Sequence, residues 1–316
     1  MISETVIHVG LHKTATTFLQ REVFPQLSDI SLVTRPYTQH NHAFNQMQYA
    51  DESLYDAEKV SKELEKISSD GRRLLLSDES FSGKPVTFNY INRSIIASRL
   101  KKLLPQSTII LFIRGQVDII YSHYNQYVKT GGTKHINNFV WRSKEEISFD
   151  TFCKHRKNIP MDTLYYNTNC PSLHIDNFKY FEIIDLYKRL FHRVEVLLYE
   201  DLVNEPRRIA LRLSEVFKQP VDVTVPDHDR VNRSINSFYL STVRMGSRFE
   251  AVFGTRYIGA AARYLPAKAP FWYNYDKYYN NIQKIVGTYY VNSNRRLIER
   301  YPDIGIQKYP NKYFLG

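Results

Sequence analysis

The chain has 316 residues, of which 43% are hydrophobic and 24% charged, and this composition excludes a disordered or low-complexity chain. Its 43 basic and 32 acidic side chains give a formal net charge of +11, which favours an acidic partner: a nucleotide, an anionic glycan, a membrane surface or nucleic acid. No apolar stretch approaches the roughly 20 residues that span a bilayer, no signal peptide is recognisable, and two cysteines are too few for a disulfide framework. We therefore expect a cytoplasmic protein.

Five short apolar runs follow one another along the chain, and a polar residue or a glycine ends each of them. Between the runs lie longer segments with helical spacing, such as 57–69 and 92–104. Short buried strands that alternate with helices predict an α/β fold: a P-loop-like core with a central parallel sheet of about five strands, flanked by helices. The predicted strands are residues 5–9, 30–33, 72–77, 108–113 and 194–199.

The last third of the chain has little strand-like periodicity and predicts a helical portion. Segments 234–253 and 279–301 have helical spacing. The Pro- and Tyr-rich segment 266–281 between them predicts an ordered loop or cap, because its aromatic side chains would be costly to expose. We find no internal repeat, and we expect a single domain over residues 1–316. Its parts are a core over about 1–235 and a helical, Tyr-rich cap over about 236–316.

Residues 8–20, HVGLHKTATTFLQ, contain the strongest local signal. A strand ends at Gly10, a polar turn with Lys13 follows, and a helix continues towards Pro25. The N–H groups of a helix's first turn bind anions, and a lysine with nearby hydroxyls adds charge and donors, so a phosphate-binding loop is predicted. The spacing is not that of a Walker A loop, because only two residues separate Gly10 from Lys13. An ordinary helix start with a solvated lysine is the alternative. The hydroxyls are those of Thr14, Thr16 and Thr17.

A second signal follows the fourth predicted strand, which ends at Arg114, with Ser122 eight positions later in a predicted helix. Ligands of open α/β sheets bind beyond the carboxyl ends of the strands, so Arg114 is expected to meet the same ligand as Lys13. An arginine binds phosphate with two donors, and a serine adds a hydroxyl. A structural salt bridge is the alternative role for Arg114.

Together the two segments resemble the sulfotransferase superfamily that uses 3′-phosphoadenylyl sulfate (PAPS). The 5′-phosphosulfate loop of that family usually reads Lys, small residue, Gly, Thr, Thr, and this chain has KTATT at 13–17. The family's 3′-phosphate motif is an arginine followed eight residues later by a serine, as Arg114 and Ser122 are here. The resemblance is specific over 5–25 and 107–132. The segment 198–206, LYEDLVNEP, also resembles a recurrent sulfotransferase segment, and we expect it to add no chemistry.

One position departs from the family pattern, because Ala15 stands where the family often has glycine. An alanine holds helical backbone angles easily but adopts a positive φ only at a cost. We expect position 15 to be helical, so that the alanine is tolerated. If the loop needed a left-handed residue there, PAPS binding would suffer.

The resemblance implies sulfuryl transfer from PAPS, with 3′,5′-adenosine bisphosphate (PAP) as product and no metal. Lys13 would contact the oxygen that bridges sulfur and the 5′-phosphate. Phe18 would stack on the adenine or, as the alternative, pack in the helix core. Arg233 would close the nucleotide site or, equally, lie solvated at a helix start. The remaining assignments are Thr14, Ala15, Thr16 and Thr17 for the 5′-phosphate, and Arg114 and Ser122 for the 3′-phosphate.

The acceptor hydroxyl needs a base, and Asp78 and Glu79 follow the third predicted strand at its carboxyl end. Strand alternation predicts that they point to opposite sides. We choose Glu79, because the resemblance implies a base at the end of this strand, which is Glu in several carbohydrate enzymes. A helix cap or an ion pair is the alternative for either acid. His8, which we expect to be packed, and His12, which would contact substrate or sulfate, are rival bases.

The base and the many aromatic residues favour a carbohydrate or glycolipid acceptor, with a small phenol or alcohol as the alternative. Lys129, Lys134 and His135 are candidates for the acceptor cleft, with the Tyr-rich segment 271–279 as its cap. Two other classes compete: a nucleotide-dependent kinase using ATP and Mg²⁺, and a non-catalytic protein that binds anionic glycan. Nucleic acid is not expected as a partner, because no binding motif is present. Peripheral membrane contact stays open, and the sequence does not predict the oligomeric state.

Overall fold

The computed structural model describes residues 4–68, 71–85, 90–141, 173–225, 240–247 and 277–315. The chain forms two compact units. The first consists of Met1–Ile119, Lys179–Arg233 and Thr288–Gly316, and the second consists of Ile120–Phe178 and Ser234–Gly287. Whether residues 1–316 form a single domain stays a prediction.

The first unit contains a five-stranded sheet in the order β2-β3-β1-β4-β7, and every neighbouring pair is parallel. This confirms the predicted α/β fold with a central parallel sheet of five strands. All residues of β4 are buried, because helices cover both faces of the sheet. The strands are β1 (Thr5–His8), β2 (Ile30–Thr34), β3 (Arg73–Ser77), β4 (Thr108–Ile113) and β7 (Arg193–Leu198).

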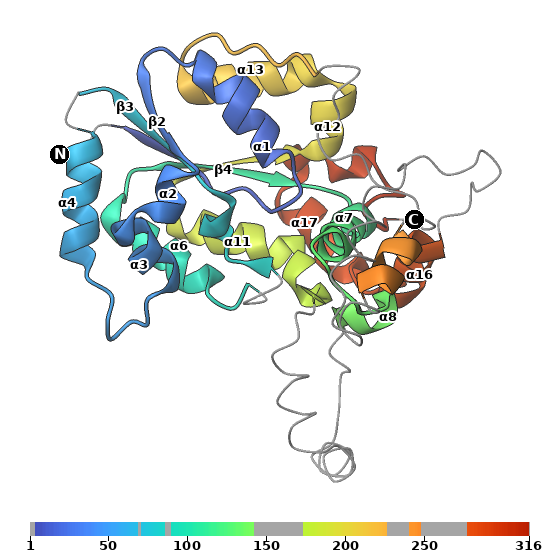
Figure 1. The fold of residues 1–316 in the computed structure, drawn as a ribbon. Coiled ribbons are helices and arrows are strands. Elements are labelled where there is room, and N and C mark those ends of the chain that lie inside the picture. The colour runs from blue at the N-terminus through green and yellow to red at the C-terminus, as the bar shows by residue number, and fades with distance from the viewer. Residues whose placement is uncertain are drawn as a thin grey trace. The chain divides into compact units, whose positions relative to one another are not determined.

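Helices lie on both sides of this sheet (Figure 1). One face is covered by α1 (Thr16–Phe18), which continues as a π-helical turn and a 3₁₀ turn to Gln26, and by α13 (Pro206–Phe217). Their apolar side chains form one buried cluster with residues of all five strands of this sheet. On the other face lie α3 (His42–Tyr49), α6 (Arg93–Leu103) and α11 (Tyr180–Leu190). The unit's further helices are α2 (Tyr37–His40), α4 (Ala57–Ile67), α12 (Tyr199–Asn204) and α17 (Val291–Arg300).

The second unit is mainly helical where the structure describes it. It contains most of α7 (Gln116–Lys129), α8 (Ile136–Phe139), α16 (Lys277–Val286) and a small parallel pair, β5 (Val140–Trp141) and β6 (Leu173–His174). Aromatic rings hold these elements together: Tyr127 stacks on Phe139 with ring centroids 4.7 Å apart, and Tyr124 lies 5.2 Å from Tyr278. Part of the high tyrosine content is therefore packing.

The predicted strand boundaries agree with the structure to within one residue. The predicted helix 279–301 is wrong as one element, because α16 and α17 are separate helices and Gly287 lies between them with φ +48°. Of the predicted helix 234–253, residues 240–247 are described and all are helical. The Pro- and Tyr-rich segment lies outside the described residues up to 276, and its last part belongs to α16. Across the described ranges, no helix is long and apolar enough to cross a membrane.

Candidate active site

The candidate site lies where three neighbouring parallel strands, β3, β1 and β4, end at one edge of the sheet. The connection after β1 leads to β2 on one side, whereas the connection after β4 leads to β7 on the other. The chain therefore diverges at the carboxyl ends of β1 and β4, which is where ligands of open α/β sheets bind. Asp78 and Glu79 follow β3, the loop 9–15 follows β1, and Arg114 follows β4.

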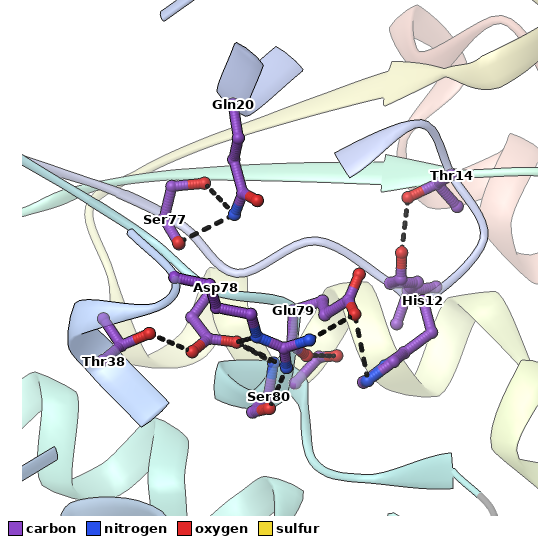
Figure 2. Close-up of polar contacts among 11 residues, drawn as sticks. His12, Thr14, Gln20, Thr38, Ser77, Asp78, Glu79 and Ser80 are labelled. Atoms are coloured by element: carbon purple, nitrogen blue, oxygen red, sulfur yellow. Dashed lines mark hydrogen bonds and ion pairs between the residues drawn. The ribbon is translucent and has the colours of Figure 1, made fainter. Parts of the chain in front are cut away.

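The loop after β1 is tightly wound and buried. The Thr14 hydroxyl donates to the Leu11 carbonyl at 2.6 Å, so this side chain closes the loop from within (Figure 2). Gly10 has φ +48°, and a Cβ built there would lie 2.9 Å from the Thr16 hydroxyl oxygen. Only glycine fits at this position without displacing a neighbour.

Ala15 is left-handed, with φ +68° and ψ +21°, so the prediction of a helical position 15 is wrong. The physical reason is that Ala15 is the N-cap of α1, and an N-cap residue has non-helical backbone angles. Lys13 is also left-handed, with φ +72°, while Thr14 between them is not. Alternation of this kind turns successive backbone N–H groups toward a common side and makes an anion-binding concavity. The loop adopts this shape with alanine in place of glycine, so the steric cost of a left-handed alanine is already met in the folded chain and does not have to be met when a ligand binds.

Arg114 lies against this loop. Its Nη1 donates to the Lys13 carbonyl at 3.1 Å, so the two basic residues of the sequence analysis are together in the first unit. The guanidinium lies 4.2 Å above the centre of the Tyr199 ring. The next residue, Gly115, donates its N–H to the Glu200 carboxylate at 2.9 Å. The segment 198–206 was expected to add no chemistry, but Tyr199 and Glu200 from it contact Arg114 and its neighbour.

Two buried donors in this cluster have no hydrogen-bond partner within the described part of the chain: the Thr16 hydroxyl and the Arg114 Nε–H. Thr16 is only 3% exposed. A buried polar group without a partner is unfavourable, and such groups in a native structure indicate a missing water or ligand. Both donors suit an anion with several oxygens, and the residues present therefore fit a nucleotide phosphate.

Two carboxylates, those of Asp78 and Glu79, follow β3, and Glu79 lies close to His12 of the loop (Figure 2). Arg35, just after β2, donates from Nε to Asp78 at 3.0 Å and from Nη1 to Glu79 at 2.8 Å. One guanidinium thus contacts both acids, and the prediction that they point to opposite sides is wrong. The reason is that β3 ends at Ser77 and a 3₁₀ turn begins at Glu79, so strand alternation no longer applies. Arg35 was not among the predicted site residues, although it lies two residues after a predicted strand.

Asp78 and Glu79 have different environments. Asp78 is buried and also accepts hydrogen bonds from the Thr38 hydroxyl and the Ser80 N–H, so its oxygens serve the local structure. The Glu79 side chain is 21% exposed, and its Oε1 lies 3.8 Å from Nε2 of His12. Burial raises the pKa of Glu79 above its ordinary value, and the nearby charges of Arg35 and Lys13 partly oppose this.

Burial, with a contribution from the Arg35 charge, lowers the pKa of His12 to about 3. Its imidazole is therefore neutral at physiological pH and a weak base. His8 is completely buried, its Nδ1 lies 2.8 Å from the Ser77 hydroxyl, and burial lowers its pKa to about 3 as well. His8 is thus packed beneath the loop, and Glu79 is the better matched base among these groups.

The other predicted residues divide into three groups. Thr17 and Phe18 lie on α1, where Phe18 packs against the core cluster, which is the alternative given for it. Ser122 and Lys129 lie on α7, and Lys134 and His135 lie between α7 and α8; all four belong to the second unit. Arg233, Cys153 and Cys170 lie outside the described residues. Within the described ranges no cluster of three or more His, Cys, Asp or Glu suits a metal.

Two solved sulfotransferases are similar in structure to this chain. One from Alicyclobacillus acidocaldarius has 18% identity and a TM-score of 0.42, covering 83% of this chain and 100% of that chain. The mouse sulfotransferase SULT7A1, complexed with PAP, has 11% identity and a TM-score of 0.36, covering 94% of this chain and 89% of that chain. No family model and no curated protein match the chain. The function proposed below therefore rests on this chain's own residues.

Proposed function

We propose that the chain is a PAPS-dependent sulfotransferase that transfers a sulfuryl group to a hydroxyl of a carbohydrate or glycolipid. The observation that carries the proposal is the pairing of Arg114 with the Lys13 loop, beside two buried donors, the Thr16 hydroxyl and the Arg114 Nε–H. The cytoplasmic location expected from the sequence is part of the same proposal.

The proposed roles divide the nucleotide between the two turns. The loop N–H groups, the Thr16 and Thr17 hydroxyls and Lys13 would bind the 5′-phosphosulfate, while Arg114 would bind the 3′-phosphate; the role of Ser122 stays a prediction from the sequence. Lys13 is positively charged and its field reaches both Glu79 and His12. It would stabilise the negative charge that develops on the leaving phosphate oxygen.

The proposed reaction is an in-line displacement similar to phosphoryl transfer. The acceptor oxygen forms a bond to sulfur while the bond from sulfur to the 5′-phosphate oxygen breaks, and PAP leaves with that electron pair. The acceptor proton passes to the Glu79 carboxylate. A base with a raised pKa suits this step, because its proton affinity is closer to that needed at neutral pH.

The first test of the proposal is thermal stabilisation by PAP, compared with ADP, with and without Mg²⁺. We expect metal-independent stabilisation by PAP, weaker stabilisation by ADP, and loss of the PAP effect in Lys13→Ala and Arg114→Ala. A ligand at about 100 times its dissociation constant adds about 2.7 kcal/mol to the free energy of unfolding, which is enough to raise the melting temperature measurably. A shift only with ADP and Mg²⁺ would favour a kinase. No shift with either nucleotide would favour a protein that binds anionic glycan.

The second test concerns the base. Glu79→Gln should leave PAP affinity near normal and slow sulfuryl transfer by roughly 100-fold or more, since a positioned base contributes about 10²–10⁴ in rate. Single-turnover transfer from PAPS to an accepted glycan measures this. Unimpaired transfer in the variant would remove Glu79 from the mechanism.

A further inference from the structure

Beyond the groups that would touch the nucleotide, the turn that holds Arg114 is bonded to residues much later in the chain. We propose that Glu200 and Tyr313 are positioning residues for Arg114: the Glu200 carboxylate joins the Gly115 N–H to the Tyr313 hydroxyl, and this fixes the Arg114 side chain for a 3′-phosphate. We name these three groups the Glu200 bridge. The inference rests on the proposed function, which assigns the 3′-phosphate to Arg114.

Glu200 is the second residue of α12 and lies in a buried environment. Its side chain is buried, and burial raises its pKa above the ordinary value. One carboxylate oxygen accepts from the Gly115 N–H at 2.9 Å, and the other accepts from the Tyr313 hydroxyl at 2.7 Å. Hydrogen bonds to an ionised acceptor are short and about twice as strong as neutral ones. Glu200 is therefore a strong local attachment for the turn after β4.

Tyr313, the other member of the bridge, is completely buried. Its backbone carbonyl accepts a hydrogen bond from the Asn294 side chain. The amide oxygen of Asn294 accepts from the Gln116 side chain at 2.9 Å. The segment Gly115–Gln116 is thus bonded to the Tyr313 region through two routes, one by way of Glu200 and one by way of Asn294.

The backbone of the turn at Arg114 and Gly115 packs closely against neighbouring residues. A Cβ built on Gly115 would lie 3.1 Å from the Lys312 Cβ and 3.2 Å from the Lys312 carbonyl oxygen. The Lys312 ammonium also forms an ion pair with Asp118, with the two atoms 2.7 Å apart. On the other side, the Tyr180 hydroxyl donates to the Arg114 carbonyl. The backbone of Arg114 and Gly115 is therefore held on several sides, which leaves the guanidinium as the part directed at the Lys13 loop.

The consequence is specific to one end of the nucleotide. PAP and adenosine 5′-monophosphate (AMP) differ only in the 3′-phosphate, so a shift of Arg114 weakens PAP and leaves AMP nearly unchanged. A general loss of structure would weaken both ligands together. The comparison of PAP with AMP therefore separates a positioning role from a merely structural one.

The test is Tyr313→Phe, which removes one buried hydroxyl and keeps the ring. The matched control is Tyr309→Phe, because the Tyr309 hydroxyl donates at 2.9 Å to Asp201, the neighbour of Glu200, and not to Glu200 itself. By calorimetric titration we expect PAP affinity to fall about 10-fold in Tyr313→Phe, from the loss of one hydrogen bond to a charged group. Tyr309→Phe should bind PAP within about 2-fold of wild type, within the scatter of a change away from the site. AMP affinity should be the same in all three proteins.

The other outcomes contradict either the positioning role or the proposed function. Unchanged PAP affinity in Tyr313→Phe, with Arg114→Ala still impaired, overturns the positioning role and leaves the proposed function intact. An equal loss of PAP and AMP affinity also overturns it. A wild-type protein that does not prefer PAP over AMP contradicts the proposed function itself. If Tyr313→Phe does not fold, Glu200→Gln replaces it, because the amide keeps the shape and removes the charge; a normal ratio of PAP to AMP affinity in that variant overturns the inference.

Discussion

At the residue scale, two glycines of the first unit both have positive φ but differ in their surroundings. A Cβ on Gly10 would lie 2.9 Å from the Thr16 hydroxyl oxygen, whereas a Cβ on Gly71 would have no atom of the described residues within 4 Å. In both alanine variants, backbone strain should lower the free energy of unfolding by about 1 kcal/mol. Gly10→Ala should lower it further, because the Thr16 hydroxyl must move. Chemical denaturation measures the difference.

The same pair separates stability from binding. Gly10→Ala should lose stabilisation by PAP, because it displaces a donor of the proposed phosphate site, while Gly71→Ala should keep it. If Gly10→Ala binds PAP as wild type does, the loop after β1 is not the phosphate site.

A second residue-scale prediction concerns Arg35, whose charge lowers the pKa of Glu79 against the effect of burial. A base acts only when ionised, so the rate should rise with pH through the pKa of Glu79. Arg35→Met removes the charge that favours the carboxylate, and the midpoint of this rise should move to higher pH. The dependence of kcat/KM on pH measures it.

The control for Arg35 is Arg212→Met, because Arg212 pairs with Glu195 at similar exposure, 28% and 17% against 27% and 21% for Arg35 and Glu79. Glu195 lies within β7, away from the edge of the sheet where the site is. The midpoint should be unchanged in this variant. A midpoint that stays fixed in Arg35→Met, or moves to lower pH, contradicts the assignment of Glu79 as the base.

At the scale of elements, α13 shows how one helix is held against the sheet. Leu213 is completely buried in the core cluster, while Leu211, two residues earlier on the same helix, is 68% exposed. Leu213→Ala should lower the free energy of unfolding by about 2–5 kcal/mol through lost contacts and a cavity. Leu211→Ala should change it by less than about 0.5 kcal/mol. Urea denaturation of the two variants tests the arrangement, and equal losses contradict it.

The strands were predictable from the sequence because each is a short apolar run with a polar residue or glycine at its end, a signal that lies within the run itself. The first helix was predicted only in outline, since its change from α to π and 3₁₀ turns between Thr16 and Gln26 depends on packing against the sheet. The break at Gly287 was missed, because a single glycine inside a helical pattern is often tolerated.

The candidate site was predictable only in part. Arg114 directly follows β4 and Lys13 lies in the loop after β1, and the edge of a parallel sheet brings such positions together. The backbone angle of Ala15 was predicted wrongly, because residue type alone suggested a helix. The Glu200 bridge was not predictable, since it joins Gly115, Glu200 and Tyr313 through tertiary contacts that leave no local pattern.

At the scale of the whole molecule, the formal net charge of +11 attracts anions from a distance. The association rate of PAP should fall about tenfold when ionic strength rises from low to high, because salt screens charges over about 10 Å at 0.1 M. Adenosine, which has no phosphate, should show no such dependence. Stopped-flow binding at several salt concentrations measures both rates, and a PAP rate that is independent of salt contradicts electrostatic attraction.

The Glu200 bridge also has a consequence for how the protein is made. Translation proceeds from the N-terminus, so a nascent chain contains the loop after β1, Arg114 and Glu200 well before Tyr313 leaves the ribosome. Until then the buried Glu200 carboxylate lacks one of its two donors, and burial of such a group without its partner is unfavourable. If Glu200 and Tyr313 position Arg114 as proposed, the turn at Arg114 takes its final position only after Tyr313 has left the ribosome, and the growing chain gains its full affinity for a 3′-phosphorylated nucleotide no earlier.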